Sequence, residues 1–181
     1  MTFHDRGHVA LEPLTEAAFA PFGEVIAARP GPAGRRYLDA YAVAAPETPT
    51  RCWISTFAPE ASGRLAVTQL EAHPHSAQAF VALQPARFVV IVADANAAGA
   101  PDPATCRAFL AEDAGGIIYR RGVWHAGMMV LDAVSSFFVV QGLVTQGNDL
   151  FVPLPAPLTI DGAGLWAPTA GALHRTPTGG A

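Results

Sequence analysis

Short apolar segments separated by turn-forming residues fill the middle of the chain. They are rich in Val, Ile, Phe, Tyr or Thr, and turn signals such as Pro-Glu-Ala-Ser-Gly and Ala-Gly-Gly lie between them. This pattern predicts strands at Cys52–Phe57, Leu65–Leu70, Gln78–Leu83, Arg87–Ala93, Thr105–Leu110, Ile117–Tyr119, Met128–Leu131 and Ser136–Gln141. The spacing leaves no room for helices of ~10–15 residues between them. The pattern therefore favours an all-β barrel or sandwich over a parallel βαβ sheet.

The two ends of the chain are patterned differently. Thr15 precedes an apolar run that has Glu16 in its first turn, and Gly23 follows the run. These signals predict an N-terminal helix of about two turns, with an irregular arm as the alternative. Towards the C-terminus the chain is rich in Pro and Gly and lacks apolar periodicity. We therefore predict a single domain over residues 1–152 and an extended C-terminal tail over residues 153–181.

Composition narrows the class of protein. The chain has 181 residues, of which 51% are hydrophobic and 14% charged, and its net charge is −4. These values exclude a nucleic-acid binder, which needs a clustered basic face, and a disordered chain. No apolar run approaches the ~18–20 residues that span a bilayer, and the N-terminus lacks the apolar stretch of a signal peptide. Cys52 and Cys106 match neither a disulfide framework nor a zinc motif, and Cys106 is predicted to be a small buried hydrophobe. The sequence predicts a soluble, cytoplasmic protein.

A first group of candidate site residues lies in the segment Leu-Glu-Ala-His-Pro-His-Ser-Ala-Gln. His73 and His75 would point to one face of a strand, because side chains alternate with a period of two. Glu71 would share that face if the strand continued unbroken. Pro74 instead favours a strand end, which would bring the imidazoles to the mouth of a cavity. Gln78 closes the segment.

A second group lies in Gly-Gly-Ile-Ile-Tyr-Arg-Arg-Gly-Val-Trp-His, which supplies Tyr119, Arg121, Trp124 and His125. A structural interpretation stands beside the functional one for each of them. A His in a strand is commonly a satisfied polar residue, and Tyr and Trp can fill core space with their polar end hydrogen-bonded. Met128 and Met129, just beyond, are predicted to line the core or a pocket.

The two groups together resemble the two-part motif of the cupin superfamily. His73-Pro74-His75 forms a His-x-His, and His125 ends a Gly-x-x-His fifty positions after His75. The resemblance implies a cupin-like antiparallel β-barrel of the jelly-roll type, in which three His project inward from facing strands.

Longer segments are similar to one cupin-like family, ureidoglycolate lyase. The similar segments, in order, are Leu11–Val25, Leu70–Leu83, Arg87–Ala93, Pro101–Leu110 and Gly116–His125. The resemblance covers roughly residues 9–150. It implies a homodimeric lyase that acts on a small-molecule substrate, cleaving ureidoglycolate into glyoxylate and urea in the breakdown of allantoin, a part of purine catabolism.

The resemblance also implies roles for individual residues. Elimination of urea needs a base for the hydroxyl proton, an acid for the departing nitrogen and a group that holds the carboxylate. The implied catalytic residues are His73, His125, Tyr119 and Gln78, and the implied substrate-binding residues are Arg107, Arg121 and Trp124. No cofactor is certain. A divalent metal (Ni, Mn or Zn) on His73, His75 and His125 could polarise the hydroxyl oxygen in place of part of the proton transfer.

Three departures from the family pattern keep alternatives open. The family typically has an Arg where this chain has Ala72, a His where it has Leu38, and an Asp-Arg pair where it has Gln141-Gly142. One alternative is a diverged enzyme of the same barrel that acts on another small hydroxy or keto acid. The other is a non-catalytic, ligand-binding dimer.

Overall fold

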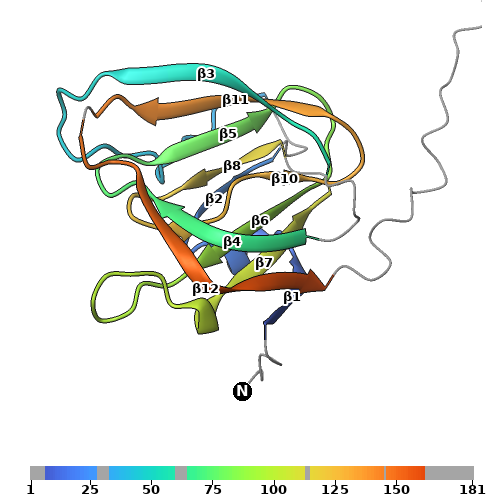
Figure 1. Ribbon diagram of the computed structural model, residues 1–181. Coiled ribbons are helices and arrows are strands. Elements are labelled where there is room, and N and C mark those ends of the chain that lie inside the picture. Colours follow the sequence, from blue (N-terminus) through green and yellow to red (C-terminus); the bar gives the residue numbers. More distant parts are fainter. Residues whose placement is uncertain (1–6, 28–32, 60–64, 113–114, 145, 162–181) are drawn as a thin grey trace, which may run out of the picture.

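The computed structural model describes residues 7–27, 33–59, 65–112, 115–144 and 146–161, and these are folded almost entirely as β-strands (Figure 1). The first sheet consists, in spatial order, of β10 (Met129–Val130), β6 (Phe88–Ala93), β7 (Arg107–Ala111), β1 (His8–Pro13), β12 (Leu150–Asp161), β4 (Leu65–Ala72) and β9 (Trp124–His125). Strand β9 also pairs with β6, so the six strands from β6 round to β9 close into a barrel. Strand β1 pairs in parallel with both of its neighbours, β7 and β12.

A second sheet covers one side of this barrel. Its strands are, in order, β2 (Gly23–Ile26), β8 (Gly116–Tyr119), β5 (Gln78–Ala82), β11 (Ser135–Gly142) and β3 (Thr50–Phe57), all paired antiparallel. Figure 1 shows this sheet, called sheet B, above the strands of the barrel. Helix α1 (Glu16–Phe19) is capped by Thr15, whose Oγ1 accepts a hydrogen bond from the Ala18 amide at 3.1 Å. A 3₁₀ turn (Pro103–Thr105) precedes β7.

Strand alternation gives the molecule two interiors. On β6, Val89 and Ile91 point into the barrel lumen, whereas Val90 and Val92 point towards sheet B. The lumen is filled by aliphatic and small side chains from five of the barrel strands and by Trp124 from β9. The second interior, called the interlayer, lies between the barrel wall and sheet B, and its core is largely aromatic. A residue's parity on its strand therefore decides which interior it enters.

The structure confirms the all-β barrel and a short N-terminal helix capped by Thr15, although this helix has four residues and not the predicted two turns. Each of the eight predicted strands has a counterpart. The sequence pattern missed β1, β2, β9 and β12. Strand β12 was not predicted because it contains Pro153, Pro155 and Pro157, which have no amide proton to donate to the neighbouring strand. Its register with β4 shifts between Pro153 and Leu158. Residues 153–161, predicted as tail, thus lie in β12, while residues 162–181 lie outside the described residues.

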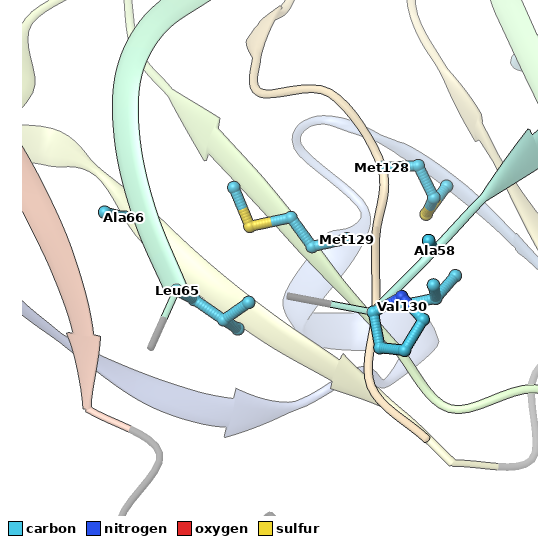
Figure 2. Close-up of a pocket in the computed structure, with 7 residues that line it drawn as sticks. Ala58, Leu65, Ala66, Met128, Met129 and Val130 are labelled. Atoms are coloured by element: carbon cyan, nitrogen blue, oxygen red, sulfur yellow. The ribbon is translucent and has the colours of Figure 1, made fainter. Parts of the chain in front are cut away.

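A pocket of about 230 Å³ lies where β3 ends and β4 begins (Figure 2). It is lined by Ala58, Pro59, Leu65, Ala66, Met128, Met129 and Val130. Met128 and Met129 thus form a pocket wall, as predicted. No side chain in the lining titrates, so acid–base chemistry must be sought elsewhere. Among the described residues, no helix is long and apolar enough to span a membrane.

Candidate active site

Three titratable side chains meet on the outer wall of the barrel, facing sheet B. Glu71 on β4 pairs in register with His125 on β9, so their side chains share one face. Leu70 and Ala72 occupy the lumen, so Glu71 points the other way, and His73 follows directly after the strand. Ligand atoms of Glu71, His73 and His125 all lie within 4.8 Å of one another. The rings of His73 and His125 are 5.3 Å apart.

The contact between His125 and Glu71 brings together two hydrogen-bond acceptors. His125 Nδ1 lies 2.9 Å from the carbonyl of Val123, which can only accept, so Nδ1 carries the proton. Nε2 of a neutral ring then presents a lone pair, and it lies 3.3 Å from Glu71 Oε1. His125 Nε2 has no hydrogen-bond partner among the described residues. The pair therefore needs a proton or a cation between its two atoms.

The His73 ring is fixed from behind by the segment before β12. Its Nδ1 donates towards the Asn148 carbonyl at 3.1 Å and the Asp149 carboxylate at 2.9 Å. Nε2 therefore carries the lone pair, and this buried atom has no partner among the described residues. Burial lowers the pKa of His73 and the neighbouring charge of His125 lowers it further, against the opposing effect of Glu71. The result is a neutral imidazole with its lone pair directed into the site.

Burial alone would raise the pKa of the Glu71 carboxyl. The contact with His125, the charge of His125 and the charge of His73 act in the opposite direction and outweigh burial, so the pKa lies below its usual range. Glu71 is therefore an anion between two imidazoles. A carboxylate and two imidazole nitrogens are a donor set that binds divalent transition metals, so these residues fit such an ion.

Sheet B supplies the opposite wall as a row of polar side chains. Tyr119, Gln78 and Gln141 are paired in register across β8, β5 and β11, and all three lie on the face towards the barrel. The Tyr119 ring stacks on His125 at 4.0 Å between centroids. Burial, followed by the charge of Glu71, raises the pKa of Tyr119 far above its usual range, so its hydroxyl keeps its proton.

The predicted site residues divide clearly. The structure brings His73, His125, Tyr119 and Gln78 together. Trp124, next to His125 on β9, instead points into the lumen, where its indole nitrogen donates to the Gly99 carbonyl at 3.0 Å. Adjacent strand residues face opposite ways, so Trp124 and His125 cannot share one site.

His75 corrects the predicted set of metal ligands. Its side chain is exposed, and it is not part of the cluster. Strand β4 ends at Ala72, before His73-Pro74-His75, so strand alternation does not extend to His75. Glu71 takes the third position instead. The period of two had already placed Glu71 on the face of His73, and this signal could have identified it. The imidazoles also face the interlayer and not the barrel lumen, contrary to the cupin expectation.

The two predicted carboxylate-binding arginines differ in availability. Arg107 is bound through Nε and Nη2 to both carboxylate oxygens of Glu12, at 3.0 and 2.7 Å, and lies over the Phe109 ring. Arg121 is exposed and donates through Nε to the Pro74 carbonyl at 3.2 Å, beside His73. No described carboxylate pairs with Arg121, so its charge is available to a ligand.

Most departures from the family pattern lie away from this site. Ala72 is buried in the lumen, and Leu38 packs on the outer face of sheet B. Gly142 also faces outward, where a Cβ would lie 2.9 Å from both Ser76 Oγ and Val43 Cγ1. Gln141 is the departure that faces the site.

The geometry defines a class of protein: a β-barrel that carries, between the barrel wall and a second sheet, a cluster of one carboxylate and two imidazoles whose donor set fits a metal ion. Comparison with known proteins narrows the class. The family described as ureidoglycolate lyase matches residues 6–160. The chain therefore belongs to the ureidoglycolate lyase family and is an enzyme of the lyase class.

Individual relatives agree with this assignment. A ureidoglycolate lyase from Burkholderia cepacia is 39% identical, covering 80% of this chain and 85% of its own length. One from Brucella melitensis biotype 2 is 37% identical over 77% of this chain and 86% of its own length. A ureidoglycolate lyase from Azotobacter vinelandii is 38% identical over 73% of this chain and 83% of its own length.

Proposed function

We propose that the protein cleaves ureidoglycolate into glyoxylate and urea in allantoin breakdown. The observation that carries this proposal is the convergence of Glu71, His73, His125 and Tyr119 on one buried site in a chain of this family. Ureidoglycolate is a carbinolamine with a carboxylate. Its cleavage requires removal of the hydroxyl proton, formation of the C=O bond, rupture of the C–N bond and protonation of the departing urea nitrogen.

His73 accepts the hydroxyl proton in this scheme. Its Nε2 lone pair faces the site, and Asp149 and Asn148 behind the ring stabilise the imidazolium that forms. The lowered pKa keeps the ring neutral, and therefore able to act as a base, at neutral pH.

The proton for the departing nitrogen comes from the His125–Glu71 pair. A proton held between His125 Nε2 and the Glu71 carboxylate removes the repulsion between two acceptors 3.3 Å apart.

Tyr119, stacked on His125, keeps its own proton and donates a hydrogen bond to the substrate. Arg121 is the proposed partner of the substrate carboxylate, because Arg107 is already neutralised by Glu12.

We propose a divalent metal, Ni, Mn or Zn, on Glu71, His73 and His125 as an alternative state of this site, in which the lone pairs of the two imidazoles bind the ion and do not take part in proton transfer. A bound ion would supply Lewis-acid polarisation of the hydroxyl oxygen in place of part of the proton transfer. Equilibrium dialysis against each ion should show one ion per chain, and Glu71→Gln should weaken that binding. A wild-type chain that takes up no ion would contradict the metal proposal and leave the acid–base scheme in place.

The activity is tested by incubating the purified protein with ureidoglycolate and coupling glyoxylate formation to its reduction. We expect turnover that His73→Ala removes. Release of glyoxylate at the buffer rate, with and without added metal, would contradict the proposed function. It would favour the alternatives, an enzyme for another small hydroxy or keto acid or a non-catalytic binding dimer. Ligand-induced shifts of the melting temperature with a panel of such acids distinguish these two.

A homodimer and a cytoplasmic location complete the proposal. The outer face of sheet B carries a row of apolar side chains, Val81, Phe138 and Ile54, and Ile54 on the edge strand β3 is 63% exposed. An exposed apolar row beside an unpaired strand edge favours association with a second copy. Light scattering should give twice the monomer mass, and Ile54→Glu should reduce it. A monomeric wild type would contradict the dimer.

A further inference from the structure

We propose that Gln78 and Gln141 form a subsite for the terminal amide of the ureido group, with Gln78 accepting from its NH₂ and Gln141 donating to its carbonyl. This inference rests on the proposed function and deepens it. It adds Gln141 to the substrate-binding residues and assigns Gln78 a specific partner atom.

The first support is position. Gln78 and Gln141 face each other on neighbouring antiparallel strands, and Tyr119 faces Gln78 from the other side. Directly opposed residues of an antiparallel pair have Cα atoms about 4.5–5.5 Å apart. The two amides therefore lie side by side, and Tyr119 joins their row to His125 by ring stacking.

The second support is the unpaired polar atoms. Gln78 is 94% buried, since its exposed fraction is 6%, and its Oε1 has no hydrogen-bond partner among the described residues. The buried Nε2 of Gln141 likewise has no partner among them. A buried acceptor or donor left unpaired typically costs about 1–3 kcal/mol of stability, so two adjacent cases need a reason. A ligand that pairs with both atoms supplies one.

The third support is chemical complementarity. The row offers one acceptor and one donor on adjacent strands, and a terminal ureido group offers the complementary NH₂ donor and carbonyl acceptor. As the C–N bond breaks, negative charge spreads onto the ureido carbonyl oxygen, where a donor such as Gln141 Nε2 is most effective. The site thereby recognises the leaving group that becomes urea.

Two substrates separate the two contacts. Ureidoglycolate and its acetamido analogue, in which a methyl group replaces the terminal NH₂, both release glyoxylate and can be followed by the same assay. We expect the wild type to prefer ureidoglycolate in kcat/KM by roughly 10- to 100-fold, since the analogue leaves Gln78 Oε1 unpaired. Gln78→Met should lower kcat/KM for ureidoglycolate and remove this preference. Gln141→Met should lower kcat/KM for both substrates by the same factor, because both keep the carbonyl.

Controls exclude a purely structural effect. Gln69→Met makes the same chemical change at an exposed position of β4 and should alter neither substrate. Gln78→Glu keeps an acceptor oxygen and should retain the preference that Gln78→Met loses. Melting temperatures should not fall in the Met variants, since each loses an unpaired buried polar atom.

The outcomes distinguish the proposed glutamine subsite from the proposed cleavage of ureidoglycolate, on which it rests. An unchanged substrate preference in Gln78→Met, or unchanged kcat/KM for both substrates in Gln141→Met, would overturn the subsite while leaving the lyase activity intact. A wild type that releases glyoxylate from neither substrate would overturn the proposed function and the subsite with it.

Discussion

The barrel lumen and the interlayer are built from the same strands, yet they differ in chemistry. The lumen is packed with aliphatic and small side chains and the Trp124 ring, and the indole nitrogen of Trp124 donates a hydrogen bond to the Gly99 carbonyl. The interlayer combines a core of aromatic rings with a cluster of titratable groups and buried polar atoms that have no partner among the described residues. The polar group of the lumen is thus hydrogen-bonded within the protein, whereas the interlayer contains polar groups that a ligand can bind.

This contrast is decided residue by residue along single strands. On β9, Trp124 enters the lumen and His125 the site; on β4, Leu70 enters the lumen and Glu71 the site. Stability and chemistry are therefore separated by strand parity and not by distance in the sequence. Substitutions at neighbouring positions should have opposite consequences.

The largest expected effect follows from removing the base. His73→Ala should lower kcat/KM for ureidoglycolate by about 10²- to 10⁴-fold, the usual contribution of a general acid–base residue. The melting temperature should stay close to that of the wild type, because the ring lies at the end of β4 and outside both apolar cores. A variant that retains more than a tenth of the wild-type rate would show that the base is another group.

A change in the lumen should act on stability alone. Leu70 is fully buried, so Leu70→Ala should lower the free energy of unfolding by about 2–5 kcal/mol. Denaturant unfolding measures this loss, and the activity of the folded fraction should be unchanged. Loss of kcat with no loss of stability would contradict the separation of the two interiors.

A smaller effect on kcat should follow from removing the charge that holds the His73 ring in place. The Asp149 carboxylate lies 2.9 Å from His73 Nδ1 and fixes the tautomer that directs Nε2 inward. Asp149→Asn should lower kcat about tenfold, the lower end of what such orienting partners contribute. Asp39→Asn, the same change at an exposed position, serves as the control. Equal kcat values in the two variants would contradict a role for Asp149 in orienting His73.

The smallest effect concerns the Glu12–Arg107 pair. Its hydrogen bond to Arg107 lowers the pKa of Glu12, although burial opposes this. A lowered folded-state pKa gives stability above the unfolded-state pKa, and this stability is lost as pH falls through the folded-state pKa. At pH 7 Glu12→Gln should cost only about 0.2–1 kcal/mol, because the carboxylate is 41% exposed. Urea unfolding should show the difference from wild type shrinking below about pH 4; a constant difference would contradict the pairing.

Much of the fold could be predicted because the strands carry local signals. Runs of β-branched and aromatic residues between turns identified the strands of sheet B except β2, and also β4, β6, β7 and β10. Strand β9 has two residues and offers no pattern to read, and the prolines of β12 mimic a loop. Which strands close the barrel depends on pairings between distant segments, and alternation within one strand contains no information about them.

The site was predictable where one motif sufficed and hidden where distant segments meet. His73 and His125 stood out as residue types, and period two already linked Glu71 to His73. Period two also separates Trp124 from His125, since adjacent residues cannot share a face. The contacts of Asp149 with His73 and of Gln141 with Gln78 join positions far apart in the chain, and no local pattern reports them.

The neighbouring residues Trp124 and His125 provide the most direct test, by measuring kcat/KM for ureidoglycolate and the melting temperature in Trp124→Phe and His125→Gln. The account predicts that His125→Gln loses glyoxylate formation and keeps its melting temperature. Trp124→Phe should melt earlier and keep its activity per folded molecule. An active His125→Gln, or a stable and inactive Trp124→Phe, would contradict the placement of the active site in the interlayer.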